Sequence, residues 1–191
     1  MRGGTVLVTG GAKRIGKAIC LRLSKEGYSI AVHYRGSKEE ADEVVATIEE
    51  SGGDAFAVCT DLSDAESASN LVSMASKNGP LCGVVNNASL FVHDDIHSID
   101  TGTWDAHMEV NAKSPMLLIR SLNESLGEGQ TACVVNVLDQ KISEPNPDHR
   151  SEHPRVGNKC RSRWSPSHHK KKTSRLPVPL HSTHHSHLHY P

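Results

Sequence analysis

Short apolar segments alternate with segments of helical periodicity over residues 1–139, and this alternation restricts the chain to few folds. The segments predicted to be strands are residues 5–8, 29–34, 55–60, 83–86 and 131–138. The spacing of apolar residues predicts helices over residues 14–26, 37–51, 63–76 and 103–126. Short, nearly all-apolar strands that are separated by helices are typical of a parallel sheet covered on both faces.

Right-handed crossovers turn this pattern into a doubly wound, mostly parallel α/β sheet of the Rossmann type. We expect five strands in the order 3-2-1-4-5. Ser37 is expected to cap the second helix, and Glu40, three residues later, completes a capping box. Pro115 falls in the middle of the long fourth helix.

The composition changes after Asp139. Residues 1–139 carry 11 Lys and Arg against 19 Asp and Glu, whereas residues 140–191 carry 10 against 3. Residues 140–191 also contain only six of Val, Ile, Leu, Met and Phe. Such a segment buries too little apolar surface to offset the entropy lost on ordering, so we expect a disordered tail rich in His, Arg, Pro and Ser.

The composition also indicates the cellular compartment in which we expect the protein. No stretch has the roughly 20 apolar residues that a membrane span needs, and the N-terminus lacks the apolar run of a secretory signal. The five cysteines are scattered without a C-x-x-C pair, and four of them are expected to be small buried apolar side chains. We therefore expect a cytoplasmic protein without a membrane partner.

A glycine-rich turn lies between the first strand and the first helix, with the sequence Thr-Gly-Gly-Ala-Lys-Arg-Ile-Gly at residues 9–16. Glycines let a backbone approach a phosphate, and a helix N-terminus offers free N–H groups. The residues expected to contact a bound phosphate group are Gly10, Lys13, Arg14, Ile15 and Gly16. The alternative is a tight connection without a ligand. A nucleoside-triphosphate loop is disfavoured because Ala18 stands where a hydroxyl should bind Mg²⁺.

The end of the second strand indicates which dinucleotide would bind. It reads His33, Tyr34, Arg35, Gly36, Ser37, without the carboxylate that usually binds the ribose 2′-hydroxyl of NAD. We expect His33, Tyr34, Arg35 and Ser37 to bind the cofactor. Arg35 and Ser37 can bind a 2′-phosphate, so we expect NADP(H), with a solvated basic turn as the alternative. The Tyr34-x-x-x-Lys38 pattern here is interpreted as a coincidence, because it lies beside the expected adenosine site.

Four landmarks at matching spacing resemble the short-chain dehydrogenase/reductase superfamily. They are residues 9–16, Asp61-Leu62, Asn86-Asn87-Ala88-Ser89 and Asn111. The resemblance is greater to the pteridine reductase and dihydromonapterin reductase branch for three reasons. Arg14 stands where most members have Gly, Ser89 stands where most have Gly, and Asp139 stands where most have the catalytic Ser.

The resemblance implies a role for each matching residue. Arg14 would contact the pyrophosphate and the substrate, and Ser89 would touch both cofactor and substrate. Phe91 matches an aromatic side chain that stacks on a pterin, with a core aromatic as the alternative. The remaining implied roles are adenine binding by Asp61 and Leu62, ribose contact by Asn87 and Ala88, organisation of a proton-relay water by Asn111, and orientation or protonation of the substrate by Asp139, for which a strand-end cap is the alternative.

The resemblance covers about residues 4–148 and then stops. The superfamily has Tyr-x-x-x-Lys on the next helix, where the tyrosine donates a proton and the lysine lowers its pKa. Here no tyrosine occurs between Tyr34 and Tyr190. We therefore expect an incomplete dinucleotide-binding domain over residues 1–148 and a disordered tail over 149–191, whose sequence is typical of a shifted reading frame or an alternative exon.

An incomplete sheet would leave residues 131–138 as an apolar edge strand. It would also expose apolar side chains around Met116, Leu117, Leu118 and Ile119, which predicts marginal stability and a homo-oligomer formed through this helix. In the tail, the histidines of residues 181–189 are expected to bind metal only adventitiously, so no metal site is predicted, and Lys170–172 are expected to be solvated without a specific nucleic-acid partner.

Two functions remain open from the sequence. The first is an NADPH-dependent short-chain reductase that transfers a hydride to a small pterin-like or carbonyl substrate, impaired by the missing Tyr-x-x-x-Lys helix. The second is a non-catalytic protein that binds a dinucleotide or pairs with a homologous subunit.

Overall fold

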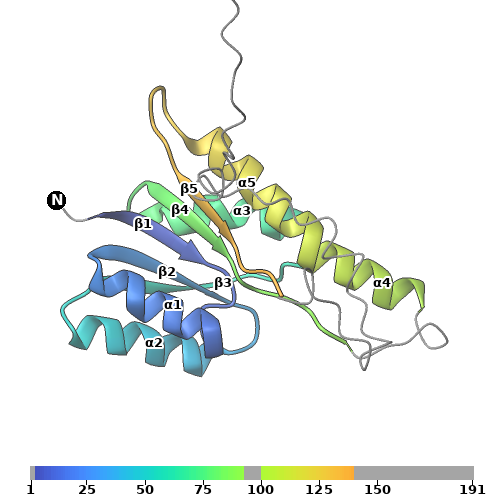
Figure 1. Ribbon diagram of the computed structural model, residues 1–191, viewed down its shortest axis with the longest axis horizontal. Helices are drawn as coiled ribbons and strands as arrows, with labels where there is room; N and C mark the ends of the chain where they lie inside the picture. The colour runs from blue at the N-terminus through green and yellow to red at the C-terminus, as the bar shows by residue number, and fades with distance from the viewer. Residues whose placement is uncertain (1–2, 93–99, 140–191) are drawn as a thin grey trace, which may run out of the picture.

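The structure is a computed structural model, and it describes residues 3–92 and 100–139. Five strands alternate with helices along the chain. Figure 1 shows how these elements are arranged. The strands are β1 (Gly3–Val8), β2 (Tyr28–Tyr34), β3 (Ala55–Cys59), β4 (Leu81–Asn86) and β5 (Cys133–Asn136). The helices are α1 (Arg14–Lys25), α2 (Lys38–Glu50), α3 (Ala65–Ala75), the 3-10 turn η1 (Ser76–Asn78), α4 (Thr101–Met108), the π segment η2 (Glu109–Lys113) and α5 (Ser114–Ser125).

The sheet has the strand order β3-β2-β1-β4-β5, and every pair of neighbours is parallel. This confirms the predicted α/β doubly wound fold and its strand order. The order reverses between β1 and β4, so the chain leaves β1 toward one edge of the sheet and β4 toward the other. Ligands of such sheets bind outside the carboxyl ends of the strands at this switch point.

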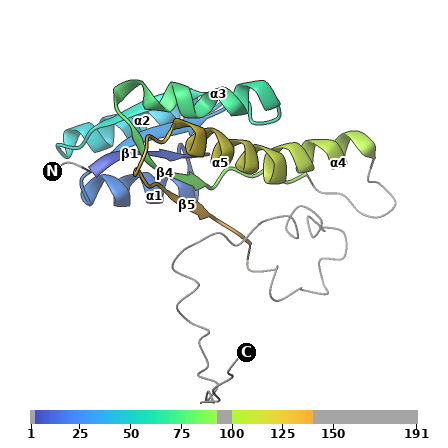
Figure 2. The same ribbon diagram turned by 90° about the horizontal axis from the view of Figure 1, so that it is seen from above.

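Both faces of the central strands are buried. On β1, Val6 and Val8 pack into a cluster with Cys20 of α1 and with α2, whereas Leu7 points into a second cluster with α3 and α5. Figure 2 shows α3 and α5 on the opposite side of the sheet from α1. Because successive side chains of a strand point to opposite faces, a strand between two helical layers must be apolar at every position.

The helix predicted over residues 103–126 is instead three segments. The π turn η2 (Glu109–Lys113) separates α4 from α5, and Pro115 lies in the first turn of α5. The chain is helical on both sides of this junction, so Pro115, which has no N–H group to donate, lies where the π turn passes into α5. The periodicity was that of a helix throughout, so the sequence pattern did not show the π turn.

The capping box predicted for α2 is wrong. Ser37 makes no side-chain hydrogen bond at the helix start, and the Glu40 carboxylate pairs with Lys13 instead. At α3 the Asp64 carboxylate accepts a hydrogen bond from the Ser67 amide, as expected of an N-cap. At α2, Glu40 therefore forms an ion pair with Lys13 of the glycine-rich turn instead of the predicted capping box with Ser37.

The predicted exposure around residues 116–119 is correct only in part. Met116 is 59% exposed, but Leu118 is fully buried and Leu117 packs against the same core cluster. The cysteine interpretation is also corrected, because Cys20 is buried while Cys59 and Cys133 are exposed. At the outer strand β5, Val135 is 41% exposed.

Several predictions fall on residues that the structure does not describe. The disordered tail, the histidines of residues 181–189 and Lys170–172 all lie outside the described ranges. Within residues 3–92 and 100–139, no helix is long and apolar enough to span a membrane. The same described residues contain no group of three His, Cys, Asp or Glu side chains placed to hold a metal ion.

Candidate functional site

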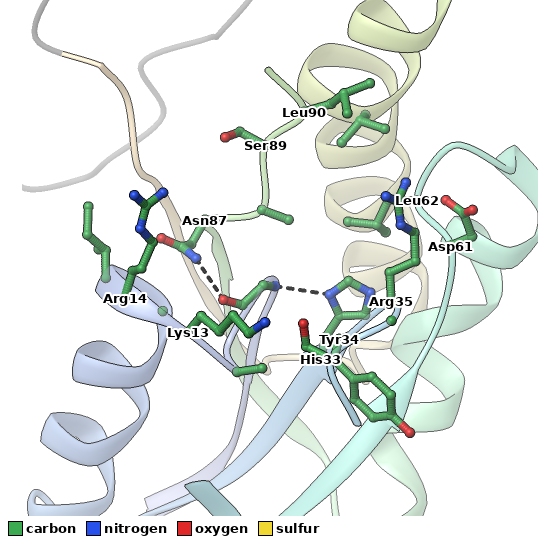
Figure 3. A pocket seen from close by; sticks show the side chains of 18 residues that line it. Lys13, Arg14, His33, Tyr34, Arg35, Asp61, Leu62, Asn87, Ser89 and Leu90 are labelled. Carbon is green, nitrogen blue, oxygen red and sulfur yellow. Dashed lines mark hydrogen bonds between the residues drawn. The ribbon is translucent and has the colours of Figure 1, made fainter. Parts of the chain in front are cut away.

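A cavity of about 660 Å³ lies at the carboxyl ends of β1, β2, β3 and β4. Figure 3 shows its lining side chains, which come from five separate stretches of the chain. The structure brings together here all of the residues that the sequence suggested for a cofactor: Gly10, Lys13, Arg14, Ile15, Gly16, His33, Tyr34, Arg35, Ser37, Asp61, Leu62, Asn87, Ala88 and Ser89.

The glycine-rich turn is tightly folded. Gly10 has φ +62°, and Arg14 has φ 50°, which is rare for a residue with a side chain. A Cβ atom on Gly16 would lie 2.0 Å from the Gly10 carbonyl oxygen. Only glycine therefore lets α1 start this close to the end of β1.

Two side chains hold this turn from the side of β4. The Asn87 amide donates to the carbonyl oxygens of Thr9 and Gly10, at 2.9 and 3.2 Å. The Thr9 hydroxyl accepts hydrogen bonds from the backbone amides of Asn87 and Ala88, at 2.9 and 3.0 Å, and donates to the Val85 carbonyl. The loop after β4 is thus joined to the turn after β1.

His33 holds the turn from the side of β2. Its Nδ1 atom accepts a hydrogen bond from the Gly10 amide at 3.0 Å, and its Nε2 atom lies 3.0 Å from the Thr60 carbonyl oxygen (Figure 3 shows the first bond). Burial lowers the pKa of His33, so the ring is favoured in its neutral form.

Positive charge surrounds the cavity. Lys13, Arg14 and Arg35 line it, and Lys13 pairs with Glu40 of α2 at 2.6 Å. The first turn of α1 has no acidic residue, and its N-cap makes no side-chain hydrogen bond. Free N–H groups at a helix N-terminus, with three cations nearby, form an environment that favours anions.

Asp61 is the acidic residue in the lining. Its carboxylate accepts hydrogen bonds from the Ser63 amide and hydroxyl, at 2.9 and 2.8 Å, and these bonds lower the pKa of Asp61. The carboxylate is therefore ionised near neutral pH and is fixed at the end of β3.

The lining of this cavity also contains four residues that were not predicted from the sequence: Ala12, Gly36, Leu90 and Val110. Ala12 and Gly36 lie within the two turns that were predicted to bind a cofactor. They were not named as binding residues because neither has a polar side chain. Leu90 directly follows the Asn-Asn-Ala-Ser stretch. Val110 belongs to the π turn, and no sequence pattern indicated that this turn reaches the cavity.

A second cavity of about 660 Å³ lies between the π turn, α5 and the ends of β4 and β5. Ala88 lines both cavities, so the two are adjacent. The second is largely apolar, with Met108, Pro115, Met116, Ile119, Val137 and Leu138 in its wall.

Asn111 lines the second cavity rather than the first. It is 4% exposed, and its side-chain amide makes two hydrogen bonds of 2.8 Å with the Leu90 backbone, donating to the carbonyl and accepting from the N–H. Both polar atoms of the side chain therefore hold the loop after β4.

The two remaining predicted residues lie outside these linings. Phe91 is 59% exposed, which excludes the alternative that it is a core aromatic. Asp139 is exposed and follows β5. Neither belongs to the lining of the two cavities, whereas Arg14 and Ser89, the other residues suggested for substrate, both line the first cavity.

The family follows from comparison with known proteins. The family model described as "short chain dehydrogenase" matches residues 4–148. This chain belongs to the short-chain dehydrogenase family. The match ends near the residue where the sequence resemblance also ended.

Curated members of the family match over part of their length. The 3-oxoacyl-[acyl-carrier-protein] reductase FabG of Staphylococcus aureus is 31% identical over 144 residues, which are 75% of this chain and 58% of that protein. The short-chain dehydrogenase/reductase homolog YusS of Bacillus subtilis is 37% identical over 100 residues, 52% of this chain and 92% of that protein. The chain thus spans 58% of the length of the reductase from S. aureus.

Solved structures share the short-chain dehydrogenase fold. FolM alternative dihydrofolate reductase 1 from Brucella canis, complexed with NADP, is 40% identical with a TM-score of 0.72, over 76% of this chain and 59% of that one. The angucycline C-6 ketoreductase LanV, with bound NADP, is 30% identical with a TM-score of 0.70, over 77% of this chain and 59% of that one.

Proposed function

We propose that the first cavity binds NADP(H) and that the chain derives from NADPH-dependent short-chain reductases. The observation that carries this proposal is the convergence of the glycine-rich turn with Arg35 and Ser37 at one cavity, without a carboxylate at the end of β2. The NADP in the FolM and ketoreductase structures supports it.

The residues fit such a cofactor by their donor chemistry. The N-terminus of α1 with Arg14 would hold the pyrophosphate, and Lys13, Arg35 and Ser37 would hold the 2′-phosphate. Leu62 and the ionised Asp61 would hold the adenine. NADPH, when bound, supplies a hydride from its nicotinamide.

For the substrate we propose a pterin-like compound or another carbonyl compound. The FolM relative is named as a dihydrofolate reductase and LanV as a ketoreductase, which favours these two classes. Arg14 and Ser89 would contact the substrate from the wall of the first cavity, and the exposed ring of Phe91 would stack on a planar ligand. Asp139 would orient or protonate the substrate, and Asn111 would organise the relay water.

A second function is favoured by the sequence after β5. No tyrosine lies between Tyr34 and Tyr190, so the Tyr-x-x-x-Lys pair of the superfamily is missing there. A chain that binds the dinucleotide without turnover, or that associates with a second subunit through Met116 and Ile119, would need no such pair. We keep residues 1–148 as the proposed binding domain, 149–191 as a proposed tail, and the cytoplasm as the proposed location.

The test is a titration of the full chain with NADPH and NADH, followed by an assay of NADPH absorbance with dihydrobiopterin or a dicarbonyl. We expect NADPH to bind more tightly than NADH, and Arg35→Asp to reverse that order. Turnover supports the reductase, and binding without turnover supports the second function. Equal NADPH affinity in wild type and Arg35→Asp would show that the assignment of the 2′-phosphate site is wrong.

A further inference from the structure

The ring of His33 joins three separate stretches of the chain. It belongs to β2 and is only 3% exposed, accepts a hydrogen bond from Gly10 after β1, and contacts the Thr60 carbonyl after β3. Each of these stretches contributes to the wall of the first cavity, so the ring lies where its state affects the shape of the whole site.

These partners fix the tautomer of the ring. A backbone N–H only donates and a carbonyl oxygen only accepts, so Nδ1 must be unprotonated toward Gly10 and Nε2 must carry the hydrogen toward Thr60. A second proton would have to enter at Nδ1, where the Gly10 N–H already points. Protonation therefore breaks the bond to Gly10 and places two N–H groups against each other.

The Gly10 backbone has two side-chain partners in the turn. His33 accepts from its N–H group, and Asn87 donates to its carbonyl oxygen. Gly10 is also the residue at φ +62° whose carbonyl lies against Gly16 at the start of α1. Loss of the His33 bond frees this backbone at the point where the turn enters the helix.

Few charged groups lie near the His33 ring. Asp61, fixed by Ser63 at the end of β3, favours the protonated ring, but burial opposes protonation more strongly and the pKa of His33 is lowered overall. The other ionisable groups of the cavity are Tyr34 at the end of β2, Arg35 directly after it, and Lys13 and Arg14 on the turn, with Glu40 of α2 bonded to Lys13. The lining residues from β4 onward (Asn87, Ala88, Ser89, Leu90 and Val110) do not ionise.

We propose that His33 is a positioning residue whose neutral ring holds the glycine-rich turn in its binding shape, and that acid releases the turn and weakens dinucleotide binding. This proposal rests on the proposed function of the cavity. It gives His33 a role that does not require contact with the cofactor.

Two conservative variants separate the two bonds of the ring. His33→Asn places an amide oxygen near the position of Nδ1, so it keeps the acceptor for Gly10 without a titrating group. His33→Gln reaches the position of Nε2 with an amide NH₂, so it keeps the donor to Thr60 and loses the acceptor. Circular dichroism of each full-length variant at each pH verifies that it is folded.

The first readout is the Kd of NADP⁺, measured by calorimetry from pH 8 to about pH 4.5. At pH 8 we expect His33→Gln to bind about tenfold more weakly than wild type, and His33→Asn to stay within about threefold. As the pH falls, the wild-type Kd should rise relative to that of His33→Asn, and this ratio cancels the titration of the ligand itself. A ratio that stays constant over this range, or a His33→Gln variant that binds like wild type at pH 8, would overturn the proposal.

The second readout needs no variant and no ligand. The ¹⁵N shifts of the His33 ring report its tautomer, and hydrogen exchange reports protection of the Gly10 amide. We expect the Nε2–H tautomer at pH 8 and loss of Gly10 protection as the ring titrates; an Nδ1–H tautomer, or protection that does not follow the ring, would contradict it. If the wild-type chain binds no NADP⁺ at pH 8, the proposed function fails, while this readout still decides whether His33 holds Gly10.

Discussion

The Lys13 ammonium lies 2.6 Å from the Glu40 carboxylate, and this ion pair joins the glycine-rich turn to the first turn of α2. The side-chain hydrogen bond from Lys13 lowers the pKa of Glu40, so the carboxylate is charged at neutral pH. Lys13 also lines the first cavity, where we propose that it meets the 2′-phosphate. Glu40 therefore competes with that phosphate for the same cation.

Glu40→Gln should strengthen NADP⁺ binding about two- to fivefold, because it frees Lys13 and removes a negative charge near the phosphate. The Kd of NAD⁺, which lacks the 2′-phosphate, should not change. Calorimetry with both nucleotides measures this difference, and the gain should shrink at high salt because exposed charges are screened.

Glu43→Gln is the matched control for that variant. Glu43 lies on α2 one turn after Glu40, is exposed, and approaches Lys17 only to 3.9 Å. The Glu43→Gln substitution removes the same charge from the same helix without freeing Lys13. An equal gain in both variants would mean that net charge, and not the Lys13 pair, sets the affinity.

Leu118→Ala should lower the free energy of unfolding by about 3 kcal/mol, because its side chain is fully buried in the cluster with α3. Met116→Ala, on the same helix but 59% exposed, should cost less than about 1 kcal/mol. Urea unfolding followed by far-ultraviolet circular dichroism compares the two. Similar losses would contradict the burial of Leu118.

Gly16→Ala should destabilise the chain by about 3 kcal/mol or more, because the new Cβ would lie 2.0 Å from the Gly10 carbonyl oxygen. Gly36→Ala is the comparison, since a Cβ there meets nothing within 4 Å and the backbone needs no positive φ. Its midpoint in urea should change little. A Gly16→Ala variant as stable as Gly36→Ala would show that the turn is looser than described.

Asn111→Ala should cost about 2 kcal/mol, because it leaves both backbone groups of Leu90 without their partner. Asn123→Ala removes the same side chain from an exposed position of α5 and should change stability by less than about 0.5 kcal/mol. Thermal melts of both variants give the comparison. A melting temperature of Asn111→Ala equal to that of Asn123→Ala would argue against the role of Asn111 in holding the loop.

The fold could be predicted because its signal is repeated along the chain. Each strand is mainly apolar, and each helix shows its own period, so the α/β alternation and the strand order follow from general rules. The π turn Glu109–Lys113 was not predictable in the same way. Its apolar spacing differs too little from that of an α-helix, and both Val110 of the turn and Leu118 of α5 pack into the same core cluster.

The lining of the first cavity could be predicted because parallel strands place their following residues at one edge. The hydrogen bonds within it could not, since they join residues far apart in sequence. The ring of His33 bonds to Gly10, 23 positions earlier, and Asn87 bonds to Thr9, 78 positions earlier. For Glu40, the sequence predicted a local capping box with Ser37, but the carboxylate pairs with Lys13, which is distant in the sequence.

The π turn also sets the rotational phase between α4 and α5. Each residue of an α-helix advances the side-chain direction by about 100°, and a π turn contains one residue more than an α turn. Deleting one residue from Glu109–Lys113 would therefore rotate α5 by about that angle and carry Leu118 away from the sheet. The insertion or deletion of a single codon in this segment would therefore change which side of α5 faces the sheet, along the whole length of the helix.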